Sequence, residues 1–332
     1  MTKSCLITGA TGMAGSAMIE YILENHHDYK ILACRRRHSD MSNVLHLLDN
    51  KLVEWIHLDL TDTLEVEKTI EWFLPNKIFH LGAQSFVPRS WKAPIETINV
   101  NVLGSVNLFE SVRKYTPEST IHVAGSSEEY GLVYPHETPI KETNPLRPLS
   151  PYACSKVMLE NLSYTYFKSY GTKVVITRAF NHTGIYRGEE FVTAQICKQA
   201  AEIALGERES FYLGNLDAQR DFTDVRDTVR AYWEASEKCN YGEPYNICSG
   251  KSHSIKQLVD IVSNIAQISN EVKQNPEKMR PADVPILLGD NSKLKEKTSW
   301  SQIYDFESDT LGGIFQHWYE KLSKHPMEKM FL

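Results

Sequence analysis

Short apolar runs alternate with longer amphipathic segments through the first half of the chain. Apolar runs of strand length lie at residues 4–8, 30–34, 52–58, 77–81 and 119–124. Between them, residues 63–73 and 98–115 carry apolar positions at helical spacing, and another helical pattern leads up to residue 23. This alternation predicts an α/β fold with a doubly wound parallel sheet and right-handed crossovers.

The strand–helix alternation breaks after residue 181. Helical segments at 194–205, 227–236 and 255–268 are mixed with turns and prolines, whereas the apolar segments 172–179 and 244–248 are expected to return to the main sheet as strands. We therefore predict two domains. The large domain comprises residues 1–180 with about 212–249, and a smaller mixed α/β domain comprises 181–211 with 250–332. The tail at 321–332 is expected to be a solvated end.

Composition and charge exclude several classes of protein. The chain has 332 residues, of which 42% are hydrophobic and 23% charged, with a net charge of −6 and a pI near 6.1. This balance argues against a nucleic-acid partner and against a polybasic membrane patch. No apolar run approaches the roughly 20 residues of a membrane span, and the first strand begins too early to leave room for a signal peptide.

The cysteines bear on metal binding and on the cellular compartment. Six cysteines are scattered with no CxxC pair, at positions 5, 34, 154, 197, 239 and 248. This spacing argues against a zinc site, and we expect no metal. It also argues against a disulfide framework and suits a reducing compartment, so we expect a cytoplasmic protein.

A glycine-rich turn links the first predicted strand to the first predicted helix. It reads Gly9-Ala10-Thr11-Gly12-Met13-Ala14-Gly15. A strand, a glycine turn and a helix N-terminus in this order allow backbone N–H groups to hold a pyrophosphate. We therefore expect Gly9, Thr11, Gly12, Met13 and Gly15 to bind a dinucleotide. The alternative is a glycine turn without a ligand, because the spacing is GxxGxxG rather than GxGxxG.

The end of the second predicted strand indicates which dinucleotide is bound. An NAD-preferring site usually places an acidic residue there for the ribose 2′-hydroxyl. This strand instead ends in Arg35-Arg36-Arg37. Guanidinium groups attract a 2′-phosphate, so we expect Arg35 and Arg36 to select NADP(H) over NAD(H). A solvated surface loop is the alternative.

Other candidate cofactor contacts follow the ends of later strands, where ligands bind in sheets of this kind. Asp59 and Leu60 are expected to contact the adenine end, although Asp59 has the alternative role of a helix N-cap or turn residue. After the fourth strand comes Leu81-Gly82-Ala83-Gln84-Ser85, in which Ala83 would line the path to the nicotinamide. Leu81 and Gln84 complete the expected cofactor contacts.

Tyr152 and Lys156 lie four residues apart at the start of a segment with helical composition. This spacing places a phenol and an ammonium on one helix face. A nearby cation favours phenolate, and can bring a pKa of about 10 closer to the working pH. Such a tyrosine can exchange a proton with a hydroxyl or carbonyl oxygen, and Ser126 could hold the same oxygen. The alternative is a helix that carries both residues by chance.

These features together resemble the extended short-chain dehydrogenases/reductases, whose cofactor domain is a Rossmann fold. The resemblance rests on the glycine turn, residues 81–85, Ser126 and the Tyr152/Lys156 pair. Three longer segments narrow it, at 181–193, 213–221 and 280–284. They resemble the GDP-mannose 4,6-dehydratases and the related reductases that act on GDP-4-keto-6-deoxy sugars to form GDP-rhamnose.

The resemblance implies a GDP-linked sugar as substrate, bound by the smaller domain. In this family pattern the nucleotide is surrounded by Asn181, Arg187, Val192, Asn215, Arg220 and Arg280, and Ser85 is also expected to bind the substrate. The three arginines suit a diphosphate, because guanidinium matches phosphate oxygens in bidentate fashion. Each arginine taken alone could equally form a surface ion pair. Related enzymes pair through the helix that carries the tyrosine, so we expect a homodimer, or a homotetramer built from such dimers.

Two activities fit the resemblance, and the residues favour the reductase. Residues 222–227, Phe-Thr-Asp-Val-Arg-Asp, are more similar to the reductase, and residues 270–278 are shorter than the matching dehydratase segment. In the reductase, Tyr152 protonates the C4 oxygen, Lys156 tunes Tyr152 and Ser126 orients the oxygen.

The main alternative is the 4,6-dehydratase. There Glu128 would remove the C5 proton, which calls for a raised carboxyl pKa; otherwise Glu128 is a hydrogen-bonded wall or a helix-start acid. A dinucleotide-sensing module without catalysis is a remote third possibility, because Ser126, Tyr152 and Lys156 are all present.

Overall fold

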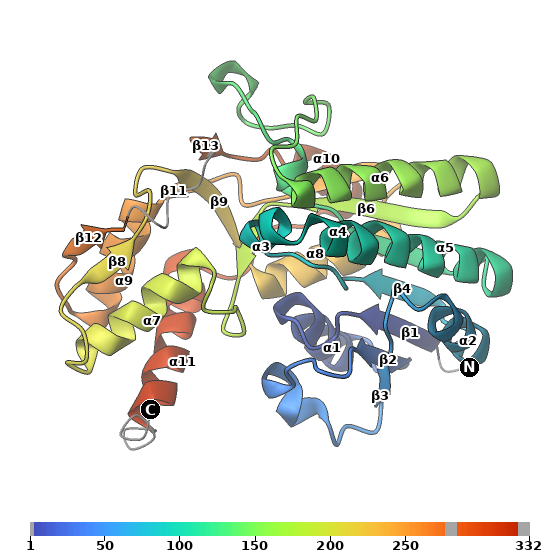
Figure 1. The fold of residues 1–332 in the computed structure, drawn as a ribbon, viewed down its shortest axis with the longest axis horizontal. Helices are drawn as coiled ribbons and strands as arrows, with labels where there is room; N and C mark the ends of the chain where they lie inside the picture. The colour runs from blue at the N-terminus through green and yellow to red at the C-terminus, as the bar shows by residue number, and fades with distance from the viewer. Residues whose placement is uncertain (1–2, 276–283, 325–332) are drawn as a thin grey trace.

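A seven-stranded parallel sheet forms the centre of the molecule in the computed structural model, which describes residues 3–275 and 284–324. The strand order is β10-β6-β5-β4-β1-β2-β3, and Figure 1 labels β6, β4, β1, β2 and β3 of this sheet. The strands are β1 (Lys3–Thr8), β2 (Tyr29–Arg35), β3 (Val53–His57), β4 (Lys77–His80), β5 (Thr120–Ala124), β6 (Lys173–Ala179) and β10 (Pro244–Ile247). The predicted doubly wound parallel sheet is confirmed, including the return of residues 172–179 and 244–248 to it.

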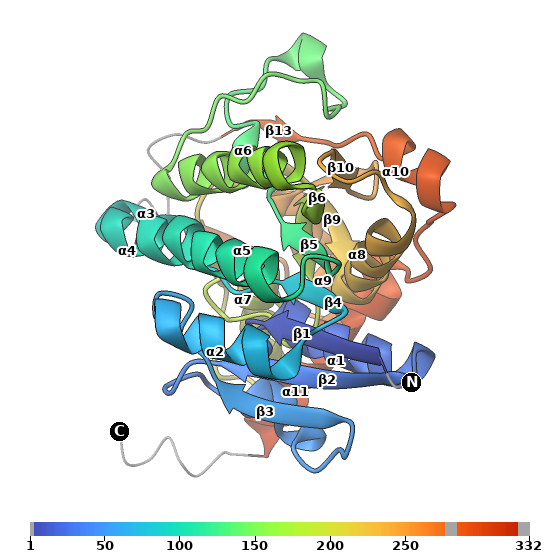
Figure 2. The ribbon, with the colours of Figure 1, turned by 90° about the vertical axis from the view of Figure 1, so that its right-hand side faces the viewer.

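Helices cover both faces of this sheet. One face carries α1 (Met13–Asn25), α8 (Val225–Lys238) and α10 (Ser292–Thr298), and the other carries α2 (Thr63–Phe73), α5 (Gly104–Tyr115) and α6 (Pro151–Tyr170). Figure 2 shows the two layers on either side of the strands. Successive strand residues point to opposite faces. Accordingly, Cys5 and Ile7 join the core under α1 and α8, whereas Leu6 joins the core under α2, α5 and α6.

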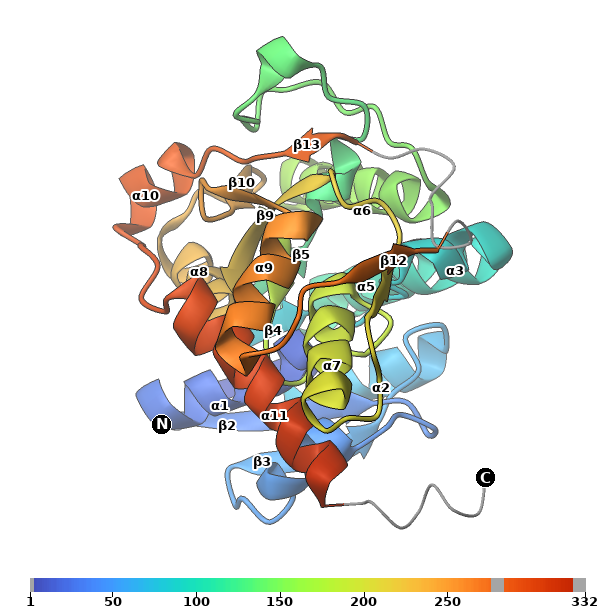
Figure 3. The ribbon, with the colours of Figure 1, turned by 90° about the vertical axis from the view of Figure 1, so that its left-hand side faces the viewer.

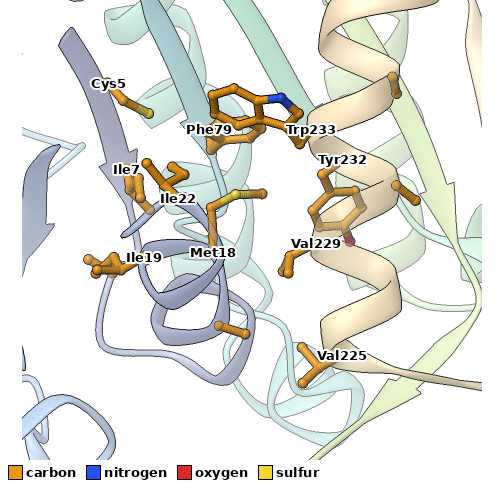
Figure 4. Packing of buried hydrophobic residues seen from close by; sticks show 14 of the residues in the cluster. Cys5, Ile7, Met18, Ile19, Ile22, Phe79, Val225, Val229, Tyr232 and Trp233 are labelled. Atoms are coloured by element: carbon orange, nitrogen blue, oxygen red, sulfur yellow. The ribbon is translucent and has the colours of Figure 1, made fainter. Parts of the chain in front are cut away.

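The core between α1, α8 and the sheet is built from large side chains (Figure 4). Met18 and Ile22 of α1 face Trp233 of α8, and the Trp233 ring stacks on Phe79 of β4 with centroids 5.7 Å apart. Each such side chain contributes about 1.5–3 kcal/mol when it is fully buried. This packing holds the strand ends in fixed relative positions, and the candidate site depends on those ends.

Smaller sheets and further helices form a second part of the molecule (Figure 3). A four-stranded sheet contains β7 (Asn181–Thr183), β9 (Gln219–Asp224), β11 (Ser252–Ser254) and β13 (Ile286–Leu287). A two-stranded sheet pairs β8 (Phe211–Leu213) with β12 (Val272–Gln274). Their apolar side chains pack with α7 (Val192–Ala204), α9 (Ile255–Ala266) and α11 (Gly312–Ser323) around a separate core.

The predicted domain boundary runs between elements that pack together in the structure. Residues 212–249 were assigned to the large domain, and α8 and β10 within them do pack on the large sheet. However, β8 and β9 pair with strands of the small sheets. In the opposite sense, α10 packs against α8 and β10. The division into two domains stays a prediction, and strand pairing indicates more crossings between them than sequence periodicity suggests.

The helix expected at residues 98–115 is interrupted. It is divided into α4 (Pro94–Ile98), a π-helical turn η2 (Asn99–Leu103) and α5. A short helix, α3 (Val87–Lys92), precedes it. The π turn carries Asn101, whose side chain binds the backbone of Gln84 and the hydroxyl of Ser155.

Among the described residues, no helix has the length and apolarity that a bilayer crossing requires.

Candidate functional site

A cavity of about 1410 Å³ opens beyond the carboxyl ends of β1, β2, β4 and β5 and extends to α7 and β9. The order of the central sheet reverses between β1 and β4, and ligands bind at such switch points. The predicted site residues that line the cavity are Gly9, Thr11, Gly12, Met13, Gly15, Arg35, Arg36, Asp59, Leu60, Leu81, Ala83, Ser85, Ser126, Glu128, Tyr152, Lys156, Asn181, Arg187, Val192, Asn215 and Arg220.

Two predicted residues are not among them. The Gln84 side chain donates to Thr97 Oγ1 at 3.1 Å and accepts from the Phe86 amide at 2.7 Å. These bonds direct the Gln84 side chain toward its own loop and α4. Gln84 does not line the cavity, and its expected cofactor contact stays a prediction. Arg280 lies outside the described residues.

The glycine turn forms a cradle that side chains could not enter. Gly9 has φ +68°, and a Cβ on it would lie 2.8 Å from the Gly82 Cα atom. A Cβ on Gly15 would lie 2.2 Å from the Gly9 carbonyl oxygen. Gly12 is the N-cap of α1, where no side chain caps the helix and the first turn contains no acid. The first amides of α1 are therefore available to an anion.

Basic residues and one acid lie at the ends of β2 and β3. Arg35 and Arg36 both line the cavity, and the Arg36 amide donates to Ser39 Oγ at 3.0 Å. Asp59 accepts hydrogen bonds from the amide and hydroxyl of Thr61, while Asp62 caps α2. Burial acts to raise the pKa of Asp59, but the Thr61 hydrogen bonds bring it below its ordinary value. Asp59 is thus an ionised turn residue, as the alternative interpretation proposed, and it also lines the cavity.

Helix α6 positions Tyr152 and Lys156. The Ser150 hydroxyl accepts from the Ala153 amide at 3.1 Å and starts the helix, with a proline in its first turn. Tyr152 and Lys156 are both buried, and the Lys156 Nζ atom lies 5.9 Å from the centre of the Tyr152 ring. Lys156 Nζ donates to the Ala124 carbonyl at 2.7 Å, which ties the helix to the end of β5. Ser126, two residues farther along, contacts the Tyr152 phenol.

The electrostatics of this pair differ from the expectation. Burial raises the pKa of Tyr152 to about 12; the Ser126 hydroxyl acts to lower it, whereas Glu128 and Glu129 raise it further. Burial also lowers the pKa of Lys156 to about 8, and Glu129 acts to raise it. The Tyr152 pKa thus lies above its ordinary value and not nearer the working pH, because desolvation dominates. The tuning of Tyr152 by Lys156 stays a prediction.

Two adjacent glutamates follow Ser126 and have different environments. Glu128 lines the cavity, and its amide donates to Ser126 Oγ at 3.2 Å. Glu129 is completely buried, and its Oε1 atom accepts from the Ser126 amide at 2.7 Å. Burial raises the pKa of Glu129. The sequence signal for Glu129 was the capping box Ser126-x-x-Glu129.

The far end of the cavity contains two of the predicted arginines. The Arg187 guanidinium lies 3.4 Å from the centre of the Phe191 ring, and its buried Nε atom has no hydrogen-bond partner among the described residues. Burial lowers the pKa of Arg187 to about 10, while Tyr152 and Glu190 act to raise it. Arg220 Nη1 donates to the carbonyls of Gln219 and Val284.

Sequence reasoning missed part of the lining. Trp91, Lys92, Ile95 and Glu96 of α3 and α4 form one wall, and His182, Glu190 and Tyr232 contribute from other elements. His182 and Glu190 adjoin predicted residues, which was the available signal. Tyr232 lies on α8, far away in sequence, and no local pattern marks it.

The described ranges contain no group of three His, Cys, Asp or Glu side chains that could hold a metal ion.

The chain is similar to known proteins over most of its length. It is 34% identical to a GDP-mannose 4,6-dehydratase of Yersinia enterocolitica, with 90% of this chain and 89% of the relative covered. It is 29% identical to a GDP-6-deoxy-D-mannose reductase of Pseudomonas aeruginosa, with 90% and 92% covered.

Solved structures have the same fold. The structure of RMD from Pseudomonas aeruginosa, complexed with NADPH, superposes with a TM-score of 0.84 at 27% identity and covers 96% of this chain and all of its own. A UDP-glucose 4-epimerase of Thermus thermophilus, complexed with NAD, gives 0.84 at 26% identity, with 95% and 98% covered. The family model for GDP-mannose 4,6 dehydratase matches residues 6–310, and the chain therefore belongs to this family of nucleotide-sugar enzymes.

Proposed function

We propose that the protein is an NADPH-dependent reductase that converts the C4 ketone of a GDP-4-keto-6-deoxy sugar into an alcohol. The observation that carries the proposal is that Ser126, Tyr152 and Lys156 line the same cavity as the glycine cradle. Proton exchange at a sugar oxygen and binding of a dinucleotide can therefore take place side by side.

The residues present fit NADP(H). The uncapped start of α1 and the bare glycine backbone suit a pyrophosphate, and a Cβ at Gly9 or Gly15 would collide with the backbone that shapes this turn. Arg35 and Arg36 at the end of β2 suit a 2′-phosphate. Lys156 reaches Ala124 at the end of β5, and both Ala124 and Ala83, which follows β4, line the cavity. When bound, NADPH supplies the hydride that reduces the ketone carbon.

The side chains of this protein would supply the proton and hold the substrate. Tyr152 donates its phenolic proton to the ketone oxygen as charge develops there, and a raised pKa keeps that proton in place until it is needed. Ser126 donates a hydrogen bond to the same oxygen and orients it. Lys156 stabilises the phenolate that remains. Arg187, whose buried Nε atom has no partner among the described residues, and Arg220 are suited to the diphosphate of a GDP-linked sugar.

The lengths of the alignments favour the reductase. The alignment with the Yersinia enterocolitica dehydratase spans 336 positions but covers only 90% of this chain, so about 37 positions have no counterpart here. The alignment with the Pseudomonas aeruginosa reductase spans 303 positions for the same coverage, which leaves about four. A GDP-mannose 4,6 dehydratase of Arabidopsis thaliana, aligned over 317 positions with 92% of this chain covered, leaves about twelve. The reductase leaves the fewest of the three, which supports the expectation drawn from residues 270–278.

A GDP-mannose 4,6-dehydratase is the second candidate, and two observations favour it. Glu128 lines the cavity near Tyr152, where a dehydratase needs its base. Identity is also higher to the dehydratases, at 34% against 29% for the reductase. In this reaction Tyr152 would first accept the C4 hydroxyl proton while the hydride of C4 would pass to bound NADP⁺, and Glu128 would then remove the C5 proton and return one to the departing C6 hydroxyl. The hydride would finally return to C6 and a proton to C5, so that no cofactor is consumed.

A pair of incubations separates the two activities. The purified protein is first given GDP-mannose alone, and then the GDP-4-keto-6-deoxy sugar with NADPH. A reductase leaves GDP-mannose unchanged and consumes one NADPH for each keto sugar. Formation of a keto sugar from GDP-mannose, with no net change in NADPH, would identify a dehydratase instead.

Glu128→Gln sharpens this comparison. We expect the variant to retain most of the reductase activity, because the carboxylate has no proton to transfer in that reaction. If the protein is a dehydratase, the same change removes the base and abolishes turnover.

We also propose a homodimer as the working assembly. Helix α6 leaves the large apolar side chains of Met158 and Tyr164 exposed. Sedimentation velocity of the full chain tests this, and a species with the mass of one chain at micromolar concentration would contradict it.

A further inference from the structure

A buried charge cluster lies directly beneath Ser126, outside the cavity. It consists of Glu129, Glu160 of α6 and Arg178 of β6. The guanidinium of Arg178 is 4% exposed, the Glu160 side chain 13%, and Glu129 is completely buried. Two carboxyl groups thus share one cation where water cannot neutralise a surplus charge.

Arg178 donates hydrogen bonds to Glu160 and none to Glu129. Arg178 donates to both oxygens of Glu160, with Nε at 2.8 Å and Nη2 at 2.6 Å. Its remaining nitrogen, Nη1, donates to the Tyr130 hydroxyl and the Glu142 carbonyl. The Nε atom lies 3.9 Å from Glu129 Oε2, too far for a hydrogen bond.

One oxygen of Glu129 is left without a donor. Oε1 accepts from the Ser126 amide, but Oε2 is buried with no hydrogen-bond partner among the described residues. The side chain next to Glu129 is the carboxyl of Glu160. Two carboxylates cannot bond to each other, whereas a protonated carboxyl can donate to an ionised one. A proton on Glu129 would therefore give Oε2 a hydrogen bond to Glu160 and would remove one negative charge from the buried cluster.

The Glu129 carboxyl also lies against the backbone that holds Lys156. A Cβ on Gly125 would lie 2.7 Å from Glu129 Oε1. Gly125 separates Ser126, whose amide binds Glu129, from Ala124, whose carbonyl binds Lys156. Charge on Glu129 is thus within a few atoms of the Lys156 ammonium.

We propose that Glu129 shares a proton with Glu160 at neutral pH, and that loss of this proton at alkaline pH keeps Lys156 and Tyr152 protonated. Glu129 is then a positioning residue that acts through Ser126 and Lys156, and it touches neither substrate nor cofactor. The role assigned to Lys156 and Tyr152 rests on the proposed reductase.

The titratable and charged groups around Glu129 determine the sign of this effect. Helix α6 presents Tyr152, Lys156 and Glu160, and β6 presents Arg178. Burial raises the pKa of Glu129, Glu160 raises it further and Arg178 lowers it. Ionised Glu129 raises the pKa of both Lys156 and Tyr152. Both groups must hold a proton for reduction, so Glu129 extends activity to higher pH.

The first test detects the proton without any turnover. Infrared difference spectra of the full-length protein, recorded between neutral and alkaline pH, should show the carbonyl stretch of a buried carboxylic acid that disappears as pH rises. The band should be absent in Glu129→Gln. It should also be absent in Glu160→Gln, because Glu129 would then ionise and pair with Arg178. An unchanged band in both variants, or no band in the native protein, would overturn the shared proton.

The second test measures kcat/KM for the keto sugar against pH. Glu129→Gln should move the alkaline limb down by about one pH unit, which is about a tenfold loss of rate on that limb. Glu160→Gln should not move the limb down, since Glu129 is then ionised throughout. The control Glu118→Gln, at a side chain that is 87% exposed, should leave the limb in place.

A downward shift in Glu129→Gln without one in Glu160→Gln separates this proposal from a structural role. A carboxyl that merely supports the fold would move both limbs in the same direction or neither, and that result would refute the proposal. If no activity is found on the keto sugar, the proposed reductase fails, while the infrared result still decides whether the proton is shared. NADPH binding and thermal unfolding of each variant establish that it is folded.

Discussion

The Nζ atom of Lys156 donates a hydrogen bond of 2.7 Å to the carbonyl oxygen of Ala124. This bond joins the first turns of α6 to the carboxyl end of β5 and fixes the ammonium at the floor of the cavity. Because burial opposes the charge of Lys156, the structure holds an unfavourable cation where the proposed chemistry needs one.

The burial of Lys156 predicts how stability depends on pH. Its pKa is lowered from 10.5 to about 8, so between these values the unfolded chain binds more protons than the folded protein. The free energy of unfolding contributed by this group therefore rises with pH across that window and is lowest below it. Urea denaturation of the native protein and of Lys156→Met at several pH values should show the rise in the native protein alone. Parallel curves would contradict the lowered pKa.

Replacement of Tyr152 by phenylalanine should remove the proton donor and leave the fold intact. We expect the turnover number for the keto sugar to fall on the order of a hundredfold to ten-thousandfold. NADPH affinity, measured by fluorescence titration, should change little, because the ring and its packing remain. Normal turnover by Tyr152→Phe would exclude the assigned role. A matched control is Tyr164→Phe, at an exposed tyrosine on the same helix.

The approach of Gly9 to Gly82 predicts a large cost for a methyl group. Gly9→Ala combines a left-handed backbone with a contact of 2.8 Å to the Gly82 Cα atom. Gly206→Ala has a similar φ of +75°, but no heavy atom of the described residues lies within 4 Å of its Cβ, so it isolates the backbone cost of about 1–2 kcal/mol.

We expect Gly9→Ala to lose about twice the stability lost by Gly206→Ala in thermal unfolding, because overpacking costs a further 1–3 kcal/mol or so. NADPH affinity should fall in Gly9→Ala and remain normal in Gly206→Ala. Equal losses of stability and affinity in the two variants would indicate that the close approach is unimportant.

Cofactor selection should depend on Arg36 and much less on the adjacent Arg37. Arg36 lines the cavity at the end of β2, whereas Arg37 is exposed and does not line it. Arg36→Glu should weaken NADPH binding by about a hundredfold while affecting NADH less, because a carboxylate repels a 2′-phosphate and accepts from a 2′-hydroxyl. Isothermal titration with both cofactors measures the ratio. The control Arg37→Ala should change neither affinity by more than about twofold, and an equal effect of both substitutions would refute the assignment.

Local patterns in the sequence determined the framework of the site. Helix α2 spans the predicted residues 63–73, and the strands before the glycine turn and before Ser126 lie within a residue of their expected positions. The four-residue spacing of Tyr152 and Lys156 placed them on one helix face. These features are readable because hydrophobic periodicity and glycine geometry depend on neighbouring residues.

Only the tertiary structure decided the charges and contacts of the site. Glu128 and Glu129 are identical in type and adjacent, yet one lines the cavity and the other is buried against Glu160 and Arg178, which come from α6 and β6. The pKa of Tyr152 and the direction of the Gln84 amide likewise depend on atoms distant in sequence. Desolvation is a property of what packs around a group, so a pattern along the chain carries little information about it.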